Sequence, residues 1–189
     1  YLTHLARYEF ALEKLKSLNP NMLLDAGCGT GYGTALLGDL APTLGIDLSD
    51  EAIGYAKAAY GESAEFSVAS IEHVPMTESV VDGVVSFEVI EHIPRTDKFL
   101  REVRRVLAKQ GIFIVSTPNA ACSQWDEEAD RPANPFHETE YTKEEFLGTL
   151  SLAGFEVLET WGQTSGPKSI AMRRFAMGVG SRLARGRNL

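Results

Sequence analysis

Cysteine is scarce in this 189-residue chain. Its two cysteines, Cys28 and Cys122, are far apart and show no paired spacing, which argues against a disulfide framework or a zinc ribbon and predicts a reducing, cytoplasmic location. Long apolar runs are also missing, because none approaches the roughly 20 residues that a membrane-spanning helix needs. We therefore expect no integral membrane segment. The length predicts one compact domain over 1–189.

Acidic residues are absent after Glu159, and six basic residues follow it: Lys168, Arg173, Arg174, Arg182, Arg185 and Arg187. The net charge of −8 therefore divides into +6 for this end and −14 for the rest, which carries 12 basic and 26 acidic residues. An acidic body disfavours nonspecific nucleic-acid binding, so no nucleic-acid partner is expected. We interpret 176–189 as a solvated basic tail, with contact to an anionic substrate or a membrane surface as the alternative.

Helical and extended patterns alternate along the chain. Apolar spacing predicts helices at 1–18, 31–39, 50–60, 96–108 and 142–154, and strands at 21–27, 42–49, 64–70, 80–89, 111–118 and 155–162. The segment 118–141 holds prolines and acids without a clear period and is predicted to be a lid or substrate loop. Strands that alternate with helices indicate a doubly wound α/β fold, with a mostly parallel sheet covered on both faces.

Two helix starts carry capping residues. Ser49 is a predicted N-cap for 50–60, and Thr142 with Glu145 forms a predicted capping box, after which Gly154 stops the helix.

A glycine-rich turn, LLDAGCGTGYGTALL, follows the first predicted strand. Gly27, Gly29 and Gly31 let the backbone turn tightly and approach a ligand closely, and the turn leads into a helix N-terminus. A dinucleotide fingerprint, GxGxxG, would need a glycine where Tyr32 or Thr34 stands. This spacing disfavours an NAD-dependent oxidoreductase.

Two carboxylates limit the kinds of ligand that this turn can bind. Asp25, just before the glycines, is poorly suited to a pyrophosphate and suits a cation. Asp47 ends the second predicted strand, where an acid can accept hydrogen bonds from a ribose diol. A ribose, a positive centre and no pyrophosphate together describe S-adenosylmethionine.

Five ordered motifs, LLDAGCGTGYG, GIDLS, VVDGVVSFEVIEHI, RVLAKQGIFIVSTPN and GFEV, resemble those of class I S-adenosylmethionine-dependent methyltransferases over about 1–163. The resemblance implies a Rossmann-like fold with a seven-stranded, mostly parallel sheet, and S-adenosylmethionine as cofactor. HLARYEFA, STPN, NPFHETEYTKEEF and WGQ are similar to bacterial methyltransferases found with surface-polysaccharide and glycan biosynthesis.

The resemblance also implies cofactor contacts. The glycines would pass beneath the methionine part and ribose, Asp25 would lie near the amino group, Asp47 would bind the ribose hydroxyls, and Leu48 would pack on the adenine. Ser70 stands where the family has an acid that contacts the adenine amino group, and Phe87 would face the methionine part. The implied cofactor-binding set is Arg7, Asp25, Gly27, Cys28, Gly29, Gly31, Asp47, Leu48, Ser70, Ile71, Phe87 and Glu88.

Candidate catalytic residues are His137, His92 and Glu91. His137, in the predicted lid, is placed as a base or substrate contact. Glu88, Glu91 and His92 form an ExxEH pattern that could bring three metal ligands together, with His137 from the lid as a fourth. A similar arrangement binds a divalent metal in some class I O-methyltransferases, and carboxylate plus imidazole suits zinc or manganese better than magnesium. Spacing alone favours the metal-free interpretation, in which Glu91 and His92 brace the loop after the fourth strand.

The predicted function is transfer of a methyl group to a small-molecule or glycan-linked acceptor, on oxygen, by in-line displacement. Alternatives are a quinone-type O-methyltransferase, a small-molecule N-methyltransferase and a noncatalytic cofactor-binding relative. The sequence leaves a homodimer open.

Overall fold

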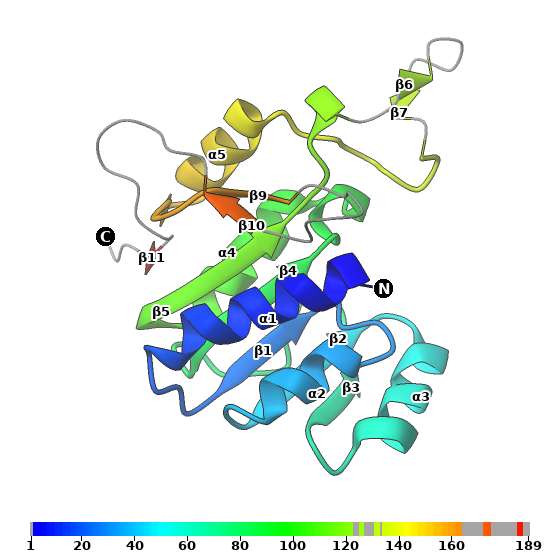
Figure 1. The fold of residues 1–189 in the computed structure, drawn as a ribbon, viewed down its shortest axis with the longest axis vertical. Helices are drawn as coiled ribbons and strands as arrows, with labels where there is room; N and C mark the ends of the chain where they lie inside the picture. Colours follow the sequence, from blue (N-terminus) through cyan, green and yellow to red (C-terminus); the bar gives the residue numbers. More distant parts are fainter. Residues whose placement is uncertain are drawn as a thin grey trace.

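Five parallel strands form the centre of the molecule. The computed structural model describes residues 2–122, 125–126, 131–132, 134–163, 172–174 and 185–186. The strands are β1 (Leu23–Ala26), β2 (Thr43–Asp47), β3 (Glu65–Val68), β4 (Val81–Phe87) and β5 (Leu107–Ser116). They pair in parallel in the order β3-β2-β1-β4-β5 (Figure 1). The order reverses between β1 and β4, which is where ligands bind in sheets of this kind.

The far edge of the sheet is less regular. Beside β5 lie two antiparallel strands of two residues each, β11 (Arg185–Gly186) and then β8 (Phe155–Glu156). Among the described residues the parallel part of the sheet therefore has five strands, and the count of the predicted seven-stranded, mostly parallel sheet is not confirmed.

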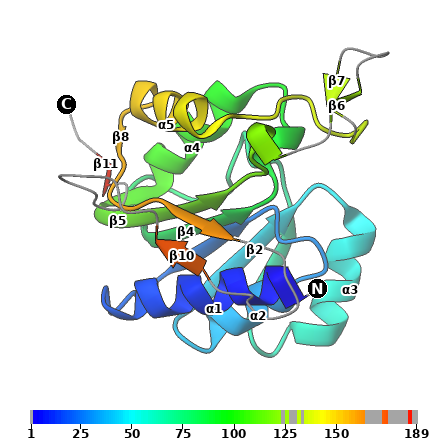
Figure 2. The same cartoon turned by 45° about the horizontal axis from the view of Figure 1, so that its top comes forward.

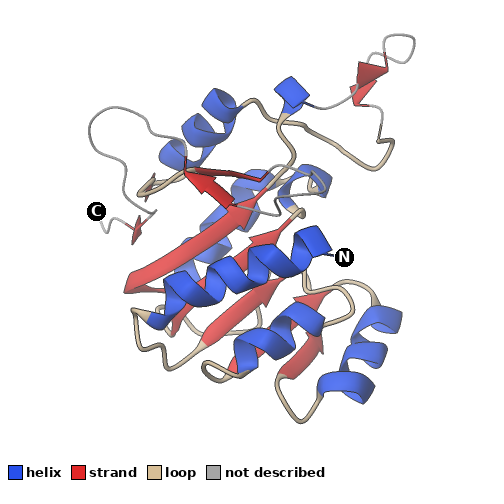
Figure 3. Ribbon diagram, viewed as in Figure 1, coloured by secondary structure: helices blue, strands red, loops and turns tan. Residues whose placement is uncertain are grey.

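Helices cover both faces of the sheet, as predicted (Figure 3). α1 (Leu2–Lys16), α2 (Tyr32–Gly38) and α3 (Asp50–Tyr60) lie on one face; α4 (Thr96–Val106) and α5 (Lys143–Leu152) lie on the other (Figure 2). Alternate strand residues belong to two apolar cores, one on each face of the sheet. Leu23 and Val85 pack with α1, whereas Leu24 and Val84 pack with α4. A strand that is buried on both faces reads as a continuous apolar run.

The predicted caps are confirmed. Ser49 Oγ accepts a hydrogen bond from Ala52 N at the start of α3. Thr142 and Glu145 form the reciprocal capping box of α5, and Gly154 adopts the left-handed conformation at φ +84°.

One predicted strand is wrong. The segment 155–162 forms no continuous strand, because β8 ends at Glu156 and β9 (Trp161–Gln163) pairs with β10 (Met172–Arg174) in a separate ribbon. At this point the chain contacts α1. Glu159 forms an ion pair with Lys14 at 2.8 Å, and the Trp161 ring packs against Phe10. These contacts with a distant helix outweigh the local preference for an extended strand.

The predicted lid is only partly described. Its described parts include the short helix η2 (Ala120–Cys122), the strands β6 (Trp125–Asp126) and β7 (Arg131–Pro132), and 134–141. Residues 123–124, 127–130 and 133 lie outside the described residues, as does the basic tail 176–189 except for β11. No helix within the described ranges is long and apolar enough to cross a membrane.

Candidate cofactor and acceptor site

The glycine turn lies at the carboxyl end of β1, beside the point where the strand order reverses. The N–H groups of Gly27 and Cys28 both donate to the carbonyl of Ile46, at 2.9 and 3.0 Å, which ties the turn to β2. Gly27, Gly29 and Gly31 all have positive φ, at +84°, +52° and +83°. Three such residues in five positions form a turn that side-chain-bearing residues would strain.

The glycines differ in what surrounds them. A Cβ atom on Gly27 would lie 2.5 Å from Val89 Cγ2, and one on Gly31 would lie 2.6 Å from Ala56 Cβ, so both are needed for packing. A Cβ on Gly29 would meet nothing within 4 Å. The turn therefore has one open position at Gly29, where a ligand can approach the backbone.

Asp25 is fully buried beneath this turn. Its carboxylate accepts hydrogen bonds from Thr34 Oγ1, at 2.7 Å, and from the Tyr8 hydroxyl, at 3.1 and 3.2 Å to the two oxygens. Burial raises the pKa of Asp25 to about 6. Its contact with the cofactor's amino group stays a prediction, and its observed partners join α1 and α2 to the turn.

Tyr8 and Thr34 were missed by the sequence analysis as site residues. Tyr8 belongs to the apolar stripe of α1, and a Cβ on Gly33 would lie 2.0 Å from its ring, so α1 rests directly on α2. Nothing in the local pattern separates Tyr8 from an ordinary core residue.

Asp47 links the turn to the end of β2. Its Oδ2 accepts from Gly29 N at 2.9 Å, and its Oδ1 accepts from Ser49 N at 2.9 Å. The adjacent Leu48 side chain is 71% exposed, and Val68 at the end of β3 is also exposed. The edge of the sheet thus presents a carboxylate next to uncovered apolar surface.

The remaining residues of the predicted adenine contact lie after β3. Ser70 Oγ accepts a hydrogen bond from Glu72 N at 3.1 Å, and Ile71 is buried. Cys28 is also buried, and burial raises the pKa of its thiol, which makes it a poor nucleophile.

Glu88 follows β4 with a left-handed backbone, φ +56°. Its carboxylate accepts from Ser116 Oγ at 2.7 Å and pairs with Arg7 Nη2 at 3.2 Å. The other terminal nitrogen of Arg7, Nη1, is buried without a hydrogen-bond partner. A buried guanidinium nitrogen without a partner favours an anionic ligand, and Phe87 closes this corner by packing edge-on against Tyr8.

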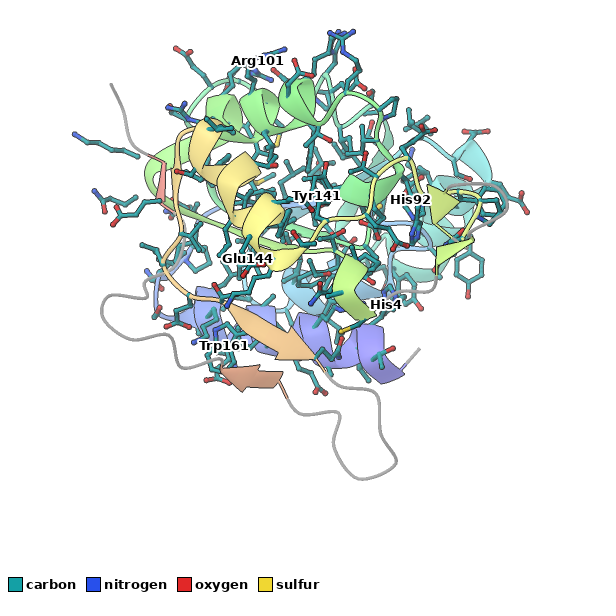
Figure 4. All side chains as sticks on the ribbon, turned by 90° about the horizontal axis from the view of Figure 1, so that it is seen from above. His4, His92, Arg101, Tyr141, Glu144 and Trp161 are labelled. Atoms are coloured by element: carbon teal, nitrogen blue, oxygen red, sulfur yellow. The ribbon has the colours of Figure 1, made fainter. Side chains whose placement is uncertain are left out.

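Glu91, His92 and His137 come together beyond Glu88. Glu91 and His92 lie in the short helix η1 (Ile90–His92), and the ring centroids of His92 and His137 are 4.9 Å apart. Burial raises the pKa of Glu91. His4 of α1 lies toward the same end of the molecule as His92, away from Trp161 (Figure 4), and burial lowers its pKa.

Residues 134–141, which belong to the predicted lid, are docked onto η1 at this cluster. Glu138 N and Thr139 N donate to the Glu91 carbonyl at 2.8 and 3.2 Å. His137 Nδ1 lies 2.6 Å from Glu140 Oε1, and Glu140 is a third residue, after Tyr8 and Thr34, that the sequence analysis did not single out.

Comparison with known proteins shows which protein family this part of the chain matches. Residues 24–115 match the family described as a methyltransferase domain. By this match, residues 24–115 resemble a methyltransferase domain. The region holds the glycine turn, Asp47, and the Glu91–His92 pair.

Relatives of the domain agree with this assignment. A "Probable S-adenosylmethionine-dependent methyltransferase" of Mycolicibacterium smegmatis is 38% identical over 74% of this chain and 54% of its own length. A malonyl-[acyl-carrier protein] O-methyltransferase of Geobacter sulfurreducens is 36% identical over 52% of this chain and 39% of its own. The chain spans about half the length of the first of these relatives.

The fold of the domain also has solved counterparts. The YcgJ protein of Bacillus subtilis has a TM-score of 0.66 at 20% identity, over 78% of this chain and 69% of that one. This likeness concerns the fold alone.

Proposed function

We propose that the protein transfers the methyl group of S-adenosylmethionine to an oxygen of a small-molecule or glycan-linked acceptor. The observation that carries this proposal is the pairing of the open Gly29 position with the Asp47 carboxylate, 2.9 Å from Gly29 N. The acceptor class rests on the motifs of α1 and the lid, and the choice of oxygen is supported by the Geobacter sulfurreducens relative.

The residues present fit the cofactor. The ribose diol would donate to Asp47, the adenine would lie on Leu48 and Val68 with its edge at Ser70 and the Ile71 N–H, and the methionine carboxylate would satisfy Arg7 Nη1. Glu88 would face the positive end of the methionine. Each part of the ligand then meets a group of matching polarity, and the buried Arg7 nitrogen gains its missing partner.

When bound, S-adenosylmethionine supplies a methyl carbon that is already activated by a sulfonium. The protein then has to hold the acceptor oxygen in line with the breaking bond and close to the methyl carbon. Glu91, His92 and His137 are the proposed groups on the acceptor side, because they form the cluster next to Glu88 at the docked lid.

The test is calorimetric titration with S-adenosylmethionine and, separately, with NAD. We expect S-adenosylmethionine alone to bind, and Asp47→Ala to weaken it at least tenfold, because hydrogen bonds to a charged group contribute roughly 1.5–3 kcal/mol. Asp39→Ala, at the exposed C-terminal end of α2, is the matched control and should bind normally. Unchanged affinity in a folded Asp47→Ala protein would show that Asp47 does not bind the ribose. Binding of NAD would overturn the assignment of S-adenosylmethionine as the cofactor.

A further inference from the structure

Three potential metal ligands converge where the lid meets η1. One ligand atom from each of Glu91, His92 and His137 lies within 4.8 Å of the others. The first two follow β4, whereas His137 belongs to a segment 45 positions further along the chain. The hydrogen bonds from Glu138 and Thr139 to the Glu91 carbonyl hold the two segments together.

The Glu91 carboxylate has an oxygen without a partner. The residue is 1% exposed, and although Oε2 accepts from Thr117 Oγ1 at 3.0 Å, Oε1 is buried and makes no hydrogen bond. Leaving such an atom unsatisfied is costly, because its hydration is lost and nothing replaces it. A cation beside Glu91 would provide the missing interaction.

Both histidines are oriented through the same ring nitrogen. His92 Nδ1 lies 2.8 Å from the Phe136 carbonyl oxygen, and His137 Nδ1 lies 2.6 Å from Glu140 Oε1. Each of these oxygens accepts, so each Nδ1 carries the proton and each Nε2 keeps a lone pair. Metal-bound histidines show this pattern, in which an outer oxygen fixes the ring and the other nitrogen binds the metal.

We infer that Glu91, His92 and His137 bind a divalent cation that prefers nitrogen ligands. Zn²⁺ is the cation used to test this site. The ligands are one Glu91 oxygen and the Nε2 atoms of both histidines; Asn134, whose side-chain nitrogen lies 2.8 Å from His137 Nε2, moves aside. Two imidazoles and one carboxylate suit Zn²⁺ better than Mg²⁺. Spacing alone favours a metal-free loop, whereas the orphaned oxygen and the oriented rings favour the site.

Glu88 is not part of this ligand set, since its oxygens are already engaged by Ser116 and Arg7. Three protein ligands leave an open coordination position, as in catalytic zinc sites. That position would hold an oxygen of the methyl acceptor, a role that rests on the proposed function, whereas cation binding itself does not.

The experiment is a titration of the metal-stripped full chain with Zn²⁺ against a chromophoric chelator, repeated with Co²⁺ to record its absorption spectrum. We expect one equivalent per chain. His92→Asn and His137→Asn should each weaken Zn²⁺ binding at least tenfold and change the Co²⁺ spectrum. Glu140→Ala removes only the outer partner of His137 and should weaken binding by about tenfold.

The matched control is His73→Asn, which removes an exposed histidine outside the cluster and should bind Zn²⁺ as the parent does. Absence of a stoichiometric site in the parent overturns the inference, as does equal binding in the His73, His92 and His137 variants. S-adenosylmethionine is titrated into the same preparations, which also reports whether each variant is folded. If the protein binds S-adenosylmethionine but shows no Zn²⁺ site, the cation site alone is overturned. If it binds Zn²⁺ but not S-adenosylmethionine, the cation site is supported and the proposed function is overturned.

Discussion

At the scale of single residues, Asp25 shows how burial changes the meaning of a motif. The acid before the glycines is expected to face a cation, which stays a prediction; in the structure its carboxylate accepts hydrogen bonds from the hydroxyls of Tyr8 and Thr34. Desolvation outweighs these two hydrogen bonds, which on their own would lower the pKa. The residue therefore couples proton binding to the packing of α1 against the turn.

Asp25→Asn is expected to remove a pH dependence of stability. The folded protein holds the proton of Asp25 more tightly than the unfolded chain does, because burial raises its pKa from 3.8 to about 6. The free energy of unfolding should therefore fall by about 3 kcal/mol, relative to Asp25→Asn, as pH rises from about 4 to about 6, and stay level above that. Urea unfolding of both proteins at several pH values measures the difference; a difference that does not change with pH would refute the raised pKa.

At the scale of elements, helix α5 is defined by its first turn. Thr142 Oγ1 accepts from Glu145 N at 3.3 Å, and Glu145 Oε2 accepts from Thr142 N at 2.8 Å. The preceding residue, Tyr141, is buried and forms a bridge with Asn119. The cap thus sets where the lid ends and the helix begins.

Thr142→Ala is expected to lower the free energy of unfolding by about 1 kcal/mol, because Glu145 N in the first turn of α5 loses its side-chain acceptor. Thr149→Ala is the control in the same helix: its hydroxyl donates to the Glu145 carbonyl, and its loss should change stability by less than about 0.5 kcal/mol. Urea unfolding of both variants makes the comparison, and equal effects would show that the capping box contributes nothing specific.

At the scale of the whole molecule, the candidate site is assembled from elements that are separated along the chain. α1 supplies Arg7, the turn after β1 supplies Gly29, β2 supplies Asp47, and Glu88 directly follows β4. The ribbon of β9 and β10 secures α1, since Gln163 Nε2 donates to the Thr3 carbonyl at 2.8 Å. Ligand binding at this site should therefore stabilise the domain as a unit.

S-adenosylmethionine at one hundred times its Kd is expected to stabilise the folded protein by about 2.7 kcal/mol. For a chain of this size that corresponds to a rise in Tm of about 5–10 °C. Thermal unfolding with and without the ligand measures the shift, with NAD as the compound that should produce none. An unchanged Tm at saturating S-adenosylmethionine would contradict the cofactor assignment.

The sequence by itself determined the features that depend on neighbouring residues. Alternating apolar periods predicted the parallel sheet with helices on both faces, the glycine spacing predicted the turn at Gly27–Gly31, and Ser49 and Thr142 predicted their helix starts. These features follow from backbone conformation and local hydrogen bonding, so a short window of sequence contains their cause.

Only the tertiary structure decided which distant groups meet. The contact of Tyr8 with Asp25, the interruption of 155–162 and the approach of His137 to His92 all depend on how α1 and the lid pack against the sheet. The energies that select these contacts come from burial and desolvation, which are properties of the assembled molecule. A residue pattern shows which groups are available, whereas packing determines which of them lose water and find a partner.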